Sequence, residues 1–217
     1  MSLDGFVAGP NQSVENPLGI GGERLHDWVV PLAVWRSAHG LAGGATDASS
    51  AVVEETQAGI GATIMGRHMF GGHPGPWNAE KPWNGWWGQN PPFHHPVFVV
   101  THHARAPLAL EGGTTFHFVT EGIEDALDRA REAAGANDVM LSGGANVARQ
   151  YLAAGLVDQI DLHLVPVFLG SGERLFEDLH DLRGLELVRT IGTPNVVHLR
   201  FARRAGIPPT DSSAGGP

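Results

Sequence analysis

The sequence predicts an α/β protein built around a mixed β-sheet. Short apolar runs alternate with segments of helical periodicity along most of the chain, which is the order of elements in α/β folds. Two of these apolar runs end in glycine where the next helix is expected to begin. Two late apolar segments, at 185–191 and 196–201, predict a closing β-hairpin, so antiparallel strands are expected beside the parallel ones.

Length and composition favour a single globular domain with a substantial core. The chain has 217 residues, of which 42% are hydrophobic and 17% charged. We expect one domain over 1–204, or at most two small ones, and a disordered tail over 205–217. The absence of cysteine excludes disulfides and thiolate metal sites.

Charge and hydropathy exclude several classes of partner. A net charge of −9 argues against nucleic acid, whose phosphates require a basic face. The first residues lack the basic and apolar regions of a signal peptide, and no stretch approaches the ~18 consecutive apolar residues of a membrane span. We therefore expect a cytoplasmic protein that binds a small molecule and neither nucleic acid nor membrane.

The expected elements follow from the spacing of apolar residues. Residues 2–8 predict the end of a strand and its turn. A helix is expected over 21–35, divided or kinked at Pro31, with one apolar face formed by Leu25, Trp28, Val29 and Leu32. Further helices are expected over 50–59, 123–130 and 145–154, and further strands over 62–65, 97–100, 115–119, 138–141 and 160–169.

A long loop over 71–96 interrupts this regular order. It holds four of the six tryptophans among many glycines and prolines. Loops longer than ~12–15 residues in compact domains are usually functional or disordered, and this one is too aromatic for simple disorder. Its tryptophans Trp83, Trp86 and Trp87 could form an aromatic floor for a planar heterocycle, attach the loop to the body, or cover a dimer interface.

Two glycine elements at strand ends are candidates for binding an anion. Ser142, Gly143 and Gly144 separate an apolar run from a helix, and Gly66 and Arg67 repeat this arrangement earlier in the chain. Glycine permits close approach of a ligand to the N–H groups at a helix start. The spacing is not that of the GxGxxG fingerprint, so a Rossmann fold is not expected. A tight turn without any ligand is the alternative.

Basic residues follow a third strand. Thr101, His102, His103 and Arg105 come after the apolar run at 97–100. With Arg67 and His68 they form the clearest basic sites of an acidic chain, and a guanidinium fork suits phosphate.

Five segments together resemble the dihydrofolate reductase-like superfamily. Within it they are most similar to the branch that contains the reductase domain of bacterial riboflavin biosynthesis. The likeness covers nearly the whole chain in order. The segments are MSLDGFVAGP, IMGRHMF, VFVVTHHAR, LSGGANVARQYLAAGLVDQIDLHLVPVFLGSGERLF and TPNVVHLRF.

The resemblance implies a three-layer fold with a mixed, mostly parallel central sheet between helices, and NADPH bound across strand ends. It implies a homodimer as well. By this resemblance the cofactor contacts are Ser142, Gly143, Gly144, Ala145 and Asn146 for the pyrophosphate, Gly66, Arg67 and His68, and Thr101 and His102 on the adenosine side. The loop that closes over the nicotinamide corresponds to Asp4, Gly5, Gly9 and Asn11.

The sequence departs from the family in two places. Relatives have a strand before SLDG, whereas this chain begins at that motif, so we expect that an upstream extension would raise stability. The acidic residue on the first helix of dihydrofolate reductases has no secure match, because Asp27 lies nearby but out of register. The candidates for a proton donor are His26, Asp27 and His163, or water.

The expected activity is NADPH-dependent reduction of a small heterocyclic, carbonyl or imine substrate, resembling 5-amino-6-(5-phosphoribosylamino)uracil reductase. Dihydrofolate or pterin reduction and a catalytically silent NADPH-binding protein are the alternatives. A metal-dependent enzyme using His94, His95, His102 and His103 is a third class, but no HExxH or comparable spacing specifies a metal, and none is expected.

Overall fold

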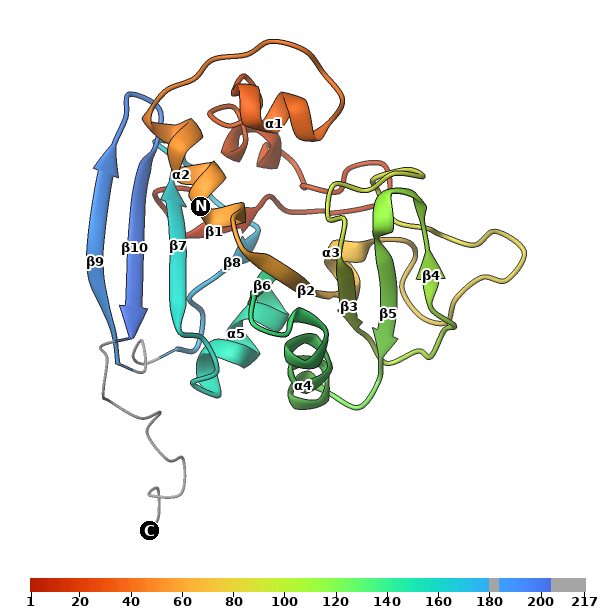
Figure 1. The fold of residues 1–217 in the computed structure, drawn as a ribbon. Helices are drawn as coiled ribbons and strands as arrows, with labels where there is room; N and C mark the ends of the chain where they lie inside the picture. Colours follow the sequence, from red (N-terminus) through yellow and green to blue (C-terminus); the bar gives the residue numbers. More distant parts are fainter. Residues whose placement is uncertain (180–183, 204–217) are drawn as a thin grey trace. The chain divides into compact units, whose positions relative to one another are not determined.

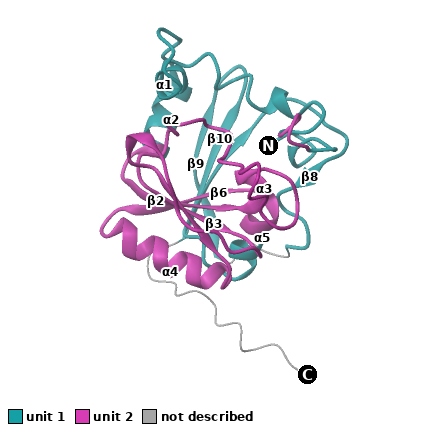
Figure 2. Ribbon diagram, turned by 90° about the vertical axis from the view of Figure 1, so that its right-hand side faces the viewer, with its two compact units in different colours: residues 1–12, 18–56, 149–217 teal, residues 13–17, 57–148 magenta. Residues whose placement is uncertain are grey.

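The computed structural model describes residues 1–179 and 184–203, so the tail expected over 205–217 lies outside the described residues. The chain divides into two compact units (Figure 2). Unit 1 comprises 1–12, 18–56 and 149–217, and unit 2 comprises 13–17 and 57–148. No helix in the described part of the chain is long and apolar enough to cross a membrane.

Unit 2 is built on a five-stranded sheet in the order β4-β5-β3-β2-β6. Three neighbouring pairs are parallel, and only β4 runs antiparallel, on the edge beside β5. The helix α4 (Ile123–Ala134) contacts β2, β3 and β6 and buries its alanine-rich face on the sheet (Figure 1). The strands are β2 (Ile60–Gly66), β3 (Pro96–Val100), β4 (Leu108–Ala109), β5 (Thr115–Val119) and β6 (Asp138–Gly143).

The core of unit 2 contains an aromatic cluster. Phe70, Phe116 and Phe118 are buried members of this cluster. The ring of Phe70 meets the rings of Phe116 and Phe118 edge to face, with centroids 5.1 and 5.3 Å apart. Side chains of the tryptophan-rich loop pack against this cluster, among them Trp77 and Trp87. Phe70 ends the one-turn helix α3 (Arg67–Phe70), and the short helix η2 (Glu111–Gly113) precedes β5.

Unit 1 contains an antiparallel sheet in the order β7-β10-β9 and a short pair formed by β1 and β8. The buried side chains of Trp28, Leu32, Val53, Val165 and Val196 form one core cluster of this unit. The elements are β1 (Phe6–Ala8), η1 (Gly22–Leu25), α1 (Ala33–Ala38), α2 (Ala48–Gln57), β7 (Gln159–Leu164), β8 (Glu173–Arg174), β9 (Leu185–Gly192) and β10 (Val197–Arg203). The helix α5 (Ala145–Ala153) begins in unit 2 and ends in unit 1.

The predicted fold class is confirmed: a mostly parallel sheet with helices on it, and a C-terminal antiparallel hairpin formed by β9 and β10. The expected division of the 21–35 helix at Pro31 is confirmed, but the helical prediction is wrong over residues 26–32. A 3-10 turn covers Gly22–Leu25, turns follow, and α1 starts only after Leu32. Pro31 is the reason, because it lacks an N–H and disfavours the helical conformation in the residue before it.

The strand expected over 160–169 is shorter than predicted. It ends at Leu164, and Pro166 follows. Because proline lacks a backbone N–H, the hydrogen-bonded strand ends before Pro166, although the alternating apolar pattern continues past it. Val165 still forms an isolated parallel bridge with Ser2, which adds the start of the chain to this region of unit 1.

Gly9 of the motif GFVAGP and Gly172 of the motif GSG allow close backbone approach in unit 1. A Cβ on Gly9 would overlap the carbonyl of Ile20, and a Cβ on Gly172 would overlap the carbonyl of Ala8. The backbone therefore leaves no room for a side chain at Gly9 or at Gly172. This packing accounts for these glycines without a ligand.

Candidate functional site

The candidate site in unit 2 lies where three neighbouring parallel strands end. β2 is hydrogen-bonded to β3 on one side and to β6 on the other. The register places Gly66 beside Val100 and Met65 beside Gly143. The residues that follow the three strands therefore meet at one edge of the sheet. Carboxyl ends of parallel strands are the usual position of ligand sites in α/β sheets.

Gly143 and Gly144 form an open cradle at the start of α5. Gly143 has φ +102°, a conformation that side-chain-bearing residues rarely adopt, and the peptide that joins it to Gly144 is cis. A Cβ on either glycine would meet nothing within 4 Å, so no neighbouring atom explains why side chains are missing here. Gly144 accepts the first helical hydrogen bond, from Ala148 N at 3.1 Å. The N–H groups of the first turn of α5 follow directly along the chain.

Gly66 belongs to the same place in the structure. A Cβ on Gly66 would lie 2.7 Å from Cγ2 of Val147 and 3.7 Å from the backbone nitrogen of Gly144. Gly66 and the Gly143–Gly144 pair therefore lie close together, although Gly66 and Gly143 are 77 residues apart in the sequence. Gly66 lets α5 approach β2, whereas Gly143 and Gly144 leave space open.

Arg67 leaves β2 directly beside this cradle. Its guanidinium carbon lies 3.7 Å from the ring centroid of Trp77, within the range of a cation–π contact. Nη2 donates to the carbonyl of His73 at 2.9 Å, while the buried Nε has no hydrogen-bond partner. Burial, and after it the charge of Arg105, lower the pKa of Arg67 from its usual value. A buried unpaired donor on a cation suits an anion.

The other predicted cofactor residues occupy less uniform positions. Thr101 is buried, and its hydroxyl accepts a hydrogen bond from His103 N at 3.2 Å while its own N–H donates to Val119 O at 2.9 Å. Its side chain thus shapes the segment after β3. His68 and His102 are exposed, Ser142 is half-buried, Ala145 is buried, and Asn146 is exposed.

The three tryptophans predicted to border the substrate face the body of unit 2. Trp83 donates its indole N–H to Phe70 O at 2.9 Å, and Trp86 donates to Met69 O at 3.0 Å. Trp87 stacks on Phe116 at 5.9 Å. Each of these contacts attaches the loop to the body. A substrate role for these side chains stays a prediction.

Asp27 lines a cavity of about 260 Å³ in unit 1. It lies in a turn after η1 and not on a helix. The cavity combines charged, amide and apolar groups, which suits a small polar ring. The lining residues are Arg24, Asp27, Trp28, Val165, Pro166, Val167 and Asn195.

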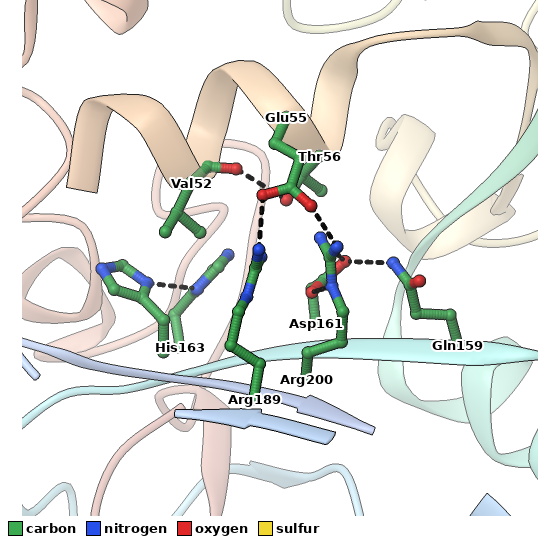
Figure 3. Close-up of polar contacts among 9 residues, drawn as sticks. Val52, Glu55, Thr56, Gln159, Asp161, His163, Arg189 and Arg200 are labelled. Carbon is green, nitrogen blue, oxygen red and sulfur yellow. Dashed lines mark hydrogen bonds and ion pairs between the residues drawn. The ribbon is translucent and has the colours of Figure 1, made fainter. Parts of the chain in front are cut away.

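His163 sits in a histidine pair beneath Trp28. Its Nδ1 lies 2.8 Å from Nδ1 of His198, whose Nε2 in turn lies 3.1 Å from Ser49 Oγ. Figure 3 labels His163. Trp28 packs against both rings at 4.9 and 5.1 Å. Burial, followed by the charge of His198, lowers the pKa of His163 to about 4. His163 is therefore neutral at pH 7, and its partner His198 contacts Ser49 of α2. A catalytic role for His163 stays a prediction.

The residues implied in the nicotinamide loop have structural partners. The carboxylate of Asp4 accepts hydrogen bonds from Leu169 N at 3.2 Å and Gly170 N at 2.7 Å. Hydrogen bonding to Ser2 and to these N–H groups lowers the pKa of Asp4 to about 2. Gly5 and Asn11 have positive φ angles, which mark turns.

The histidines weighed as metal ligands do not gather. His94 Nδ1 lies 2.8 Å from Gly112 O, and His95 Nε2 lies 2.8 Å from Thr63 Oγ1. In the ranges 1–179 and 184–203, no three His, Cys, Asp or Glu side chains are placed to hold one metal ion.

Sequence reasoning gave no role to Trp77 and did not foresee the partnership of His163 with His198. Trp77 belongs to the tryptophan-rich loop, and its ring makes the cation–π contact with Arg67. His198 lies opposite His163 in the β7–β10 register, and the sequence alone does not predict this pairing. The regular alternation of the closing strands was the available signal for His198. No local signal distinguishes Trp77 from its neighbours.

Residues 1–199 match the family model described as the RibD C-terminal domain. The chain belongs to this family. The match covers both compact units, and it agrees with the dihydrofolate reductase-like resemblance drawn from the motifs.

Solved structures show the same fold at low sequence identity. A putative riboflavin biosynthesis protein from Shewanella sp. PV-4 has a TM-score of 0.58 and 17% identity, covering 94% of this chain and 95% of that one. A diaminohydroxyphosphoribosylaminopyrimidine deaminase/5-amino-6-(5-phosphoribosylamino)uracil reductase from Thermotoga maritima has a TM-score of 0.52 and 13% identity, covering 94% and 54%. At such identities the likeness establishes the fold alone.

Two curated relatives come from Bacillus subtilis (strain 168). Uncharacterized protein YyaP is 33% identical over 73 residues, which cover 34% of this chain and 38% of YyaP. Uncharacterized protein YwjB is 29% identical over 86 residues, covering 40% and 49%. The matched part thus spans less than half the length of either relative.

Proposed function

We propose that this protein is an NADPH-dependent reductase of a small heterocyclic, carbonyl or imine substrate. The observation that carries the proposal is the meeting of Gly66–Arg67, the segment after β3, and the open Gly143–Gly144 cradle at three adjacent parallel strand ends. Membership of the RibD C-terminal domain family supports a reductase-like role. The reductase named among the solved structures, from Thermotoga maritima, points in the same direction.

The residues present fit a dinucleotide phosphate. The cradle leaves space where a Cβ would stand, and the N–H groups of α5 begin beside it. Phosphate oxygens accept from such donors and are favoured by the positive end of the helix dipole. Arg67 offers a buried, unpartnered Nε on a fixed guanidinium. We assign pyrophosphate binding to Gly143, Gly144 and the start of α5, and a further phosphate to Arg67.

The bound cofactor would supply the hydride, and the chain would supply position and a proton. Of the predicted proton donors Asp27 and His163, Asp27 is the stronger, because it lines a cavity, whereas the imidazole of His163 is held against His198 and Trp28. Arg24 and Asn195 line the same cavity and offer hydrogen bonds to the polar edge of a heterocycle. Asp27→Asn, which keeps shape and removes the acid, tests this role.

The test is a titration followed by a turnover screen. Calorimetric titration with NADPH should give micromolar binding or tighter, and Asp27→Asn should bind NADPH equally well. NADPH oxidation is then followed with pterin, pyrimidine and carbonyl substrates. Binding with turnover that Asp27→Asn abolishes supports the proposal. Binding without turnover on any substrate favours the silent NADPH-binding protein, and no binding refutes both.

A further inference from the structure

Trp28 is an aromatic residue of the cavity in unit 1, and it directly follows the proposed proton donor Asp27. Its side chain is only 9% exposed and packs in a core cluster with Val165, which lines the same cavity. The wall formed by Trp28 and Val165 therefore belongs both to the cavity and to the core of unit 1. A shift of the indole would change the shape of the cavity beside Asp27.

The histidine pair, His163 and His198, packs against this indole. Their ring centroids lie 4.9 and 5.1 Å from that of Trp28. The two Nδ1 atoms are 2.8 Å apart, so one ring donates its N–H and the other accepts it. Nε2 of His198 lies 3.1 Å from Oγ of the buried Ser49, which extends this chain of contacts from β7 through β10 to α2. Both imidazole rings are thereby held, and they in turn hold the indole that packs on them.

The backbone of the turn that carries Trp28 does not provide this support. The N–H groups of Val29 and Val30 donate to His26 O, and the N–H of Leu32 donates to Val29 O. None of these bonds uses the backbone of Trp28. The orientation of the indole therefore depends on side-chain packing, to which the histidine pair contributes two aromatic contacts.

The indole N–H of Trp28 donates to no acceptor among the described residues. In unit 2, by contrast, the indole N–H groups of Trp77, Trp83 and Trp86 donate to backbone carbonyl groups at 2.7–3.0 Å. The Trp28 nitrogen is not one of the fully buried unpartnered atoms in the described part of the chain, so it retains contact with solvent. Buried tryptophans usually place this N–H on a partner. A held, largely buried donor without a partner suits an acceptor that a ligand supplies.

We propose that Trp28 is a substrate-binding residue whose indole N–H donates to the substrate in the cavity, and that His163 and His198 are positioning residues for this indole. This rests on the proposed function. The acceptor on the substrate is a carbonyl oxygen or a ring nitrogen at the edge of a planar ring, which an indole beside a carboxylate and an amide can recognise. The two histidines act through Trp28 and contact no substrate atom.

The experiment follows the indole N–H signals of the full chain, which has six tryptophans, by heteronuclear NMR. The signal that is lost in Trp28→Phe identifies Trp28. Titration with uracil, whose ring carbonyls are acceptors, should shift this signal more than any other indole signal. Trp28→Phe keeps an aromatic ring and removes the donor, so it should bind uracil about 5-fold more weakly in a calorimetric titration. Benzene has no acceptor and should bind both proteins equally.

His163→Gln tests the positioning role, because it keeps a polar group beside His198 and removes an aromatic contact with Trp28. It should move or broaden the Trp28 signal, leave the other indole signals in place, and weaken uracil binding about 3-fold. His95→Gln is the matched control. His95 is half-buried like His163 and lies 2.8 Å from Thr63 Oγ1, but it belongs to unit 2. Its replacement should change neither the Trp28 signal nor the uracil affinity.

A Trp28 signal that uracil does not shift, or equal uracil affinity in wild type and Trp28→Phe, overturns the substrate contact. An unchanged Trp28 signal in His163→Gln, or a change spread over all the indole signals, overturns the positioning role. Titration of the same samples with NADPH separates this inference from the proposed function. NADPH binding without a uracil contact at Trp28 overturns the inference alone. A uracil contact without NADPH binding overturns the proposed function and leaves Trp28 as a ligand-binding residue.

Discussion

Each unit contains a pair of neighbouring arginines, and the two pairs differ in whether carboxylates neutralise their charge. In unit 1, Arg189 and Arg200 point from β9 and β10 toward Glu55 on α2, and Arg200 also binds Asp161 on β7 (Figure 3). The Nε of Arg200 lies 2.6 Å from Asp161 Oδ1, and hydrogen bonding to this carboxylate raises the pKa of Arg200. In unit 2, Arg67 and Arg105 rest on Trp77 with neutral acceptors only.

The difference separates a structural arrangement from a candidate binding one. In unit 1, Glu55 and Asp161 neutralise the arginines, and the resulting ion-pair network joins α2 to the sheet β7-β10-β9. These arginines have no uncompensated charge to offer a ligand. Aromatic rings and carbonyl groups orient an arginine without neutralising it, so its charge remains available. Four changes test this contrast, from the largest expected effect to the smallest.

Asp161→Asn should cost the most stability. The side chains of Asp161 and Arg200 are only 13% and 15% exposed, so removing the carboxylate charge leaves a largely buried cation whose remaining carboxylate partner is the more exposed Glu55. We expect a loss of about 3 kcal/mol in the free energy of unfolding, measured by urea denaturation. Asp158→Asn is the control, because Asp158 is 79% exposed, and it should cost less than about 1 kcal/mol. Equal losses in both variants would contradict a structural role for the network.

Arg67→Ala should change binding and not stability. Because no carboxylate in the described ion pairs depends on Arg67, its removal leaves no buried charge unpaired. We expect NADPH to bind about 30-fold more weakly while NADH is affected little, as loss of a charge-assisted phosphate contact predicts. Calorimetric titration of both nucleotides measures this. Equal weakening of NADPH and NADH would refute a contact with the 2′-phosphate.

Acid should weaken unit 1 through the histidine pair. The pKa of His163 is lowered to about 4, whereas an unfolded histidine titrates near 6.5. Between these values the unfolded state binds more protons, so stability is lost as pH falls through this window. From about pH 7.5 to about pH 5 the loss attributable to His163 should be about 2 kcal/mol. His163→Gln should show a correspondingly smaller difference between its urea midpoints at the two pH values; an unchanged difference would contradict this assignment.

Two glycine variants give the smallest effect and the sharpest contrast within unit 2. A methyl group on Gly144 meets nothing within 4 Å, so Gly144→Ala should fold normally and weaken NADPH about 10-fold by occupying the cradle. A methyl group on Gly66 would lie 2.7 Å from Val147, so Gly66→Ala should lower the melting temperature. Thermal denaturation and titration of both variants measure this. Normal NADPH affinity in Gly144→Ala would argue against the cradle.

Much of the fold was predictable because its signals are local. The buried run at β2, the glycine-terminated strand before α5 and the alternation in β9 and β10 each reflect one element's own periodicity. The two errors were the helix predicted through residues 26–32, beside Pro31, and the strand predicted beyond Leu164, beside Pro166. There the apolar spacing continued although the backbone could not continue the same hydrogen bonding.

The candidate site was predictable only in part. Glycine and arginine at strand ends are visible in the sequence, and the parallel register brought Gly66 beside the start of α5. The partners of those residues were not visible. Trp77 and Trp83 lie in the same loop, and the sequence does not distinguish them. In the structure Trp77 makes a cation–π contact with Arg67, whereas Trp83 donates its indole N–H to Phe70 O.

The sequence by itself determined the fold class, the family and the strand ends at which a nucleotide is proposed to bind, because periodicity and glycine position act within a few residues of the chain. Only the tertiary structure decided which charges are neutralised. Glu55 and Asp161 reach Arg200 from positions 145 and 39 residues away, and no carboxylate in the described ion pairs reaches Arg67. Pairing of charges depends on distances of a few ångströms between side chains remote in sequence, and only the folded chain sets those distances.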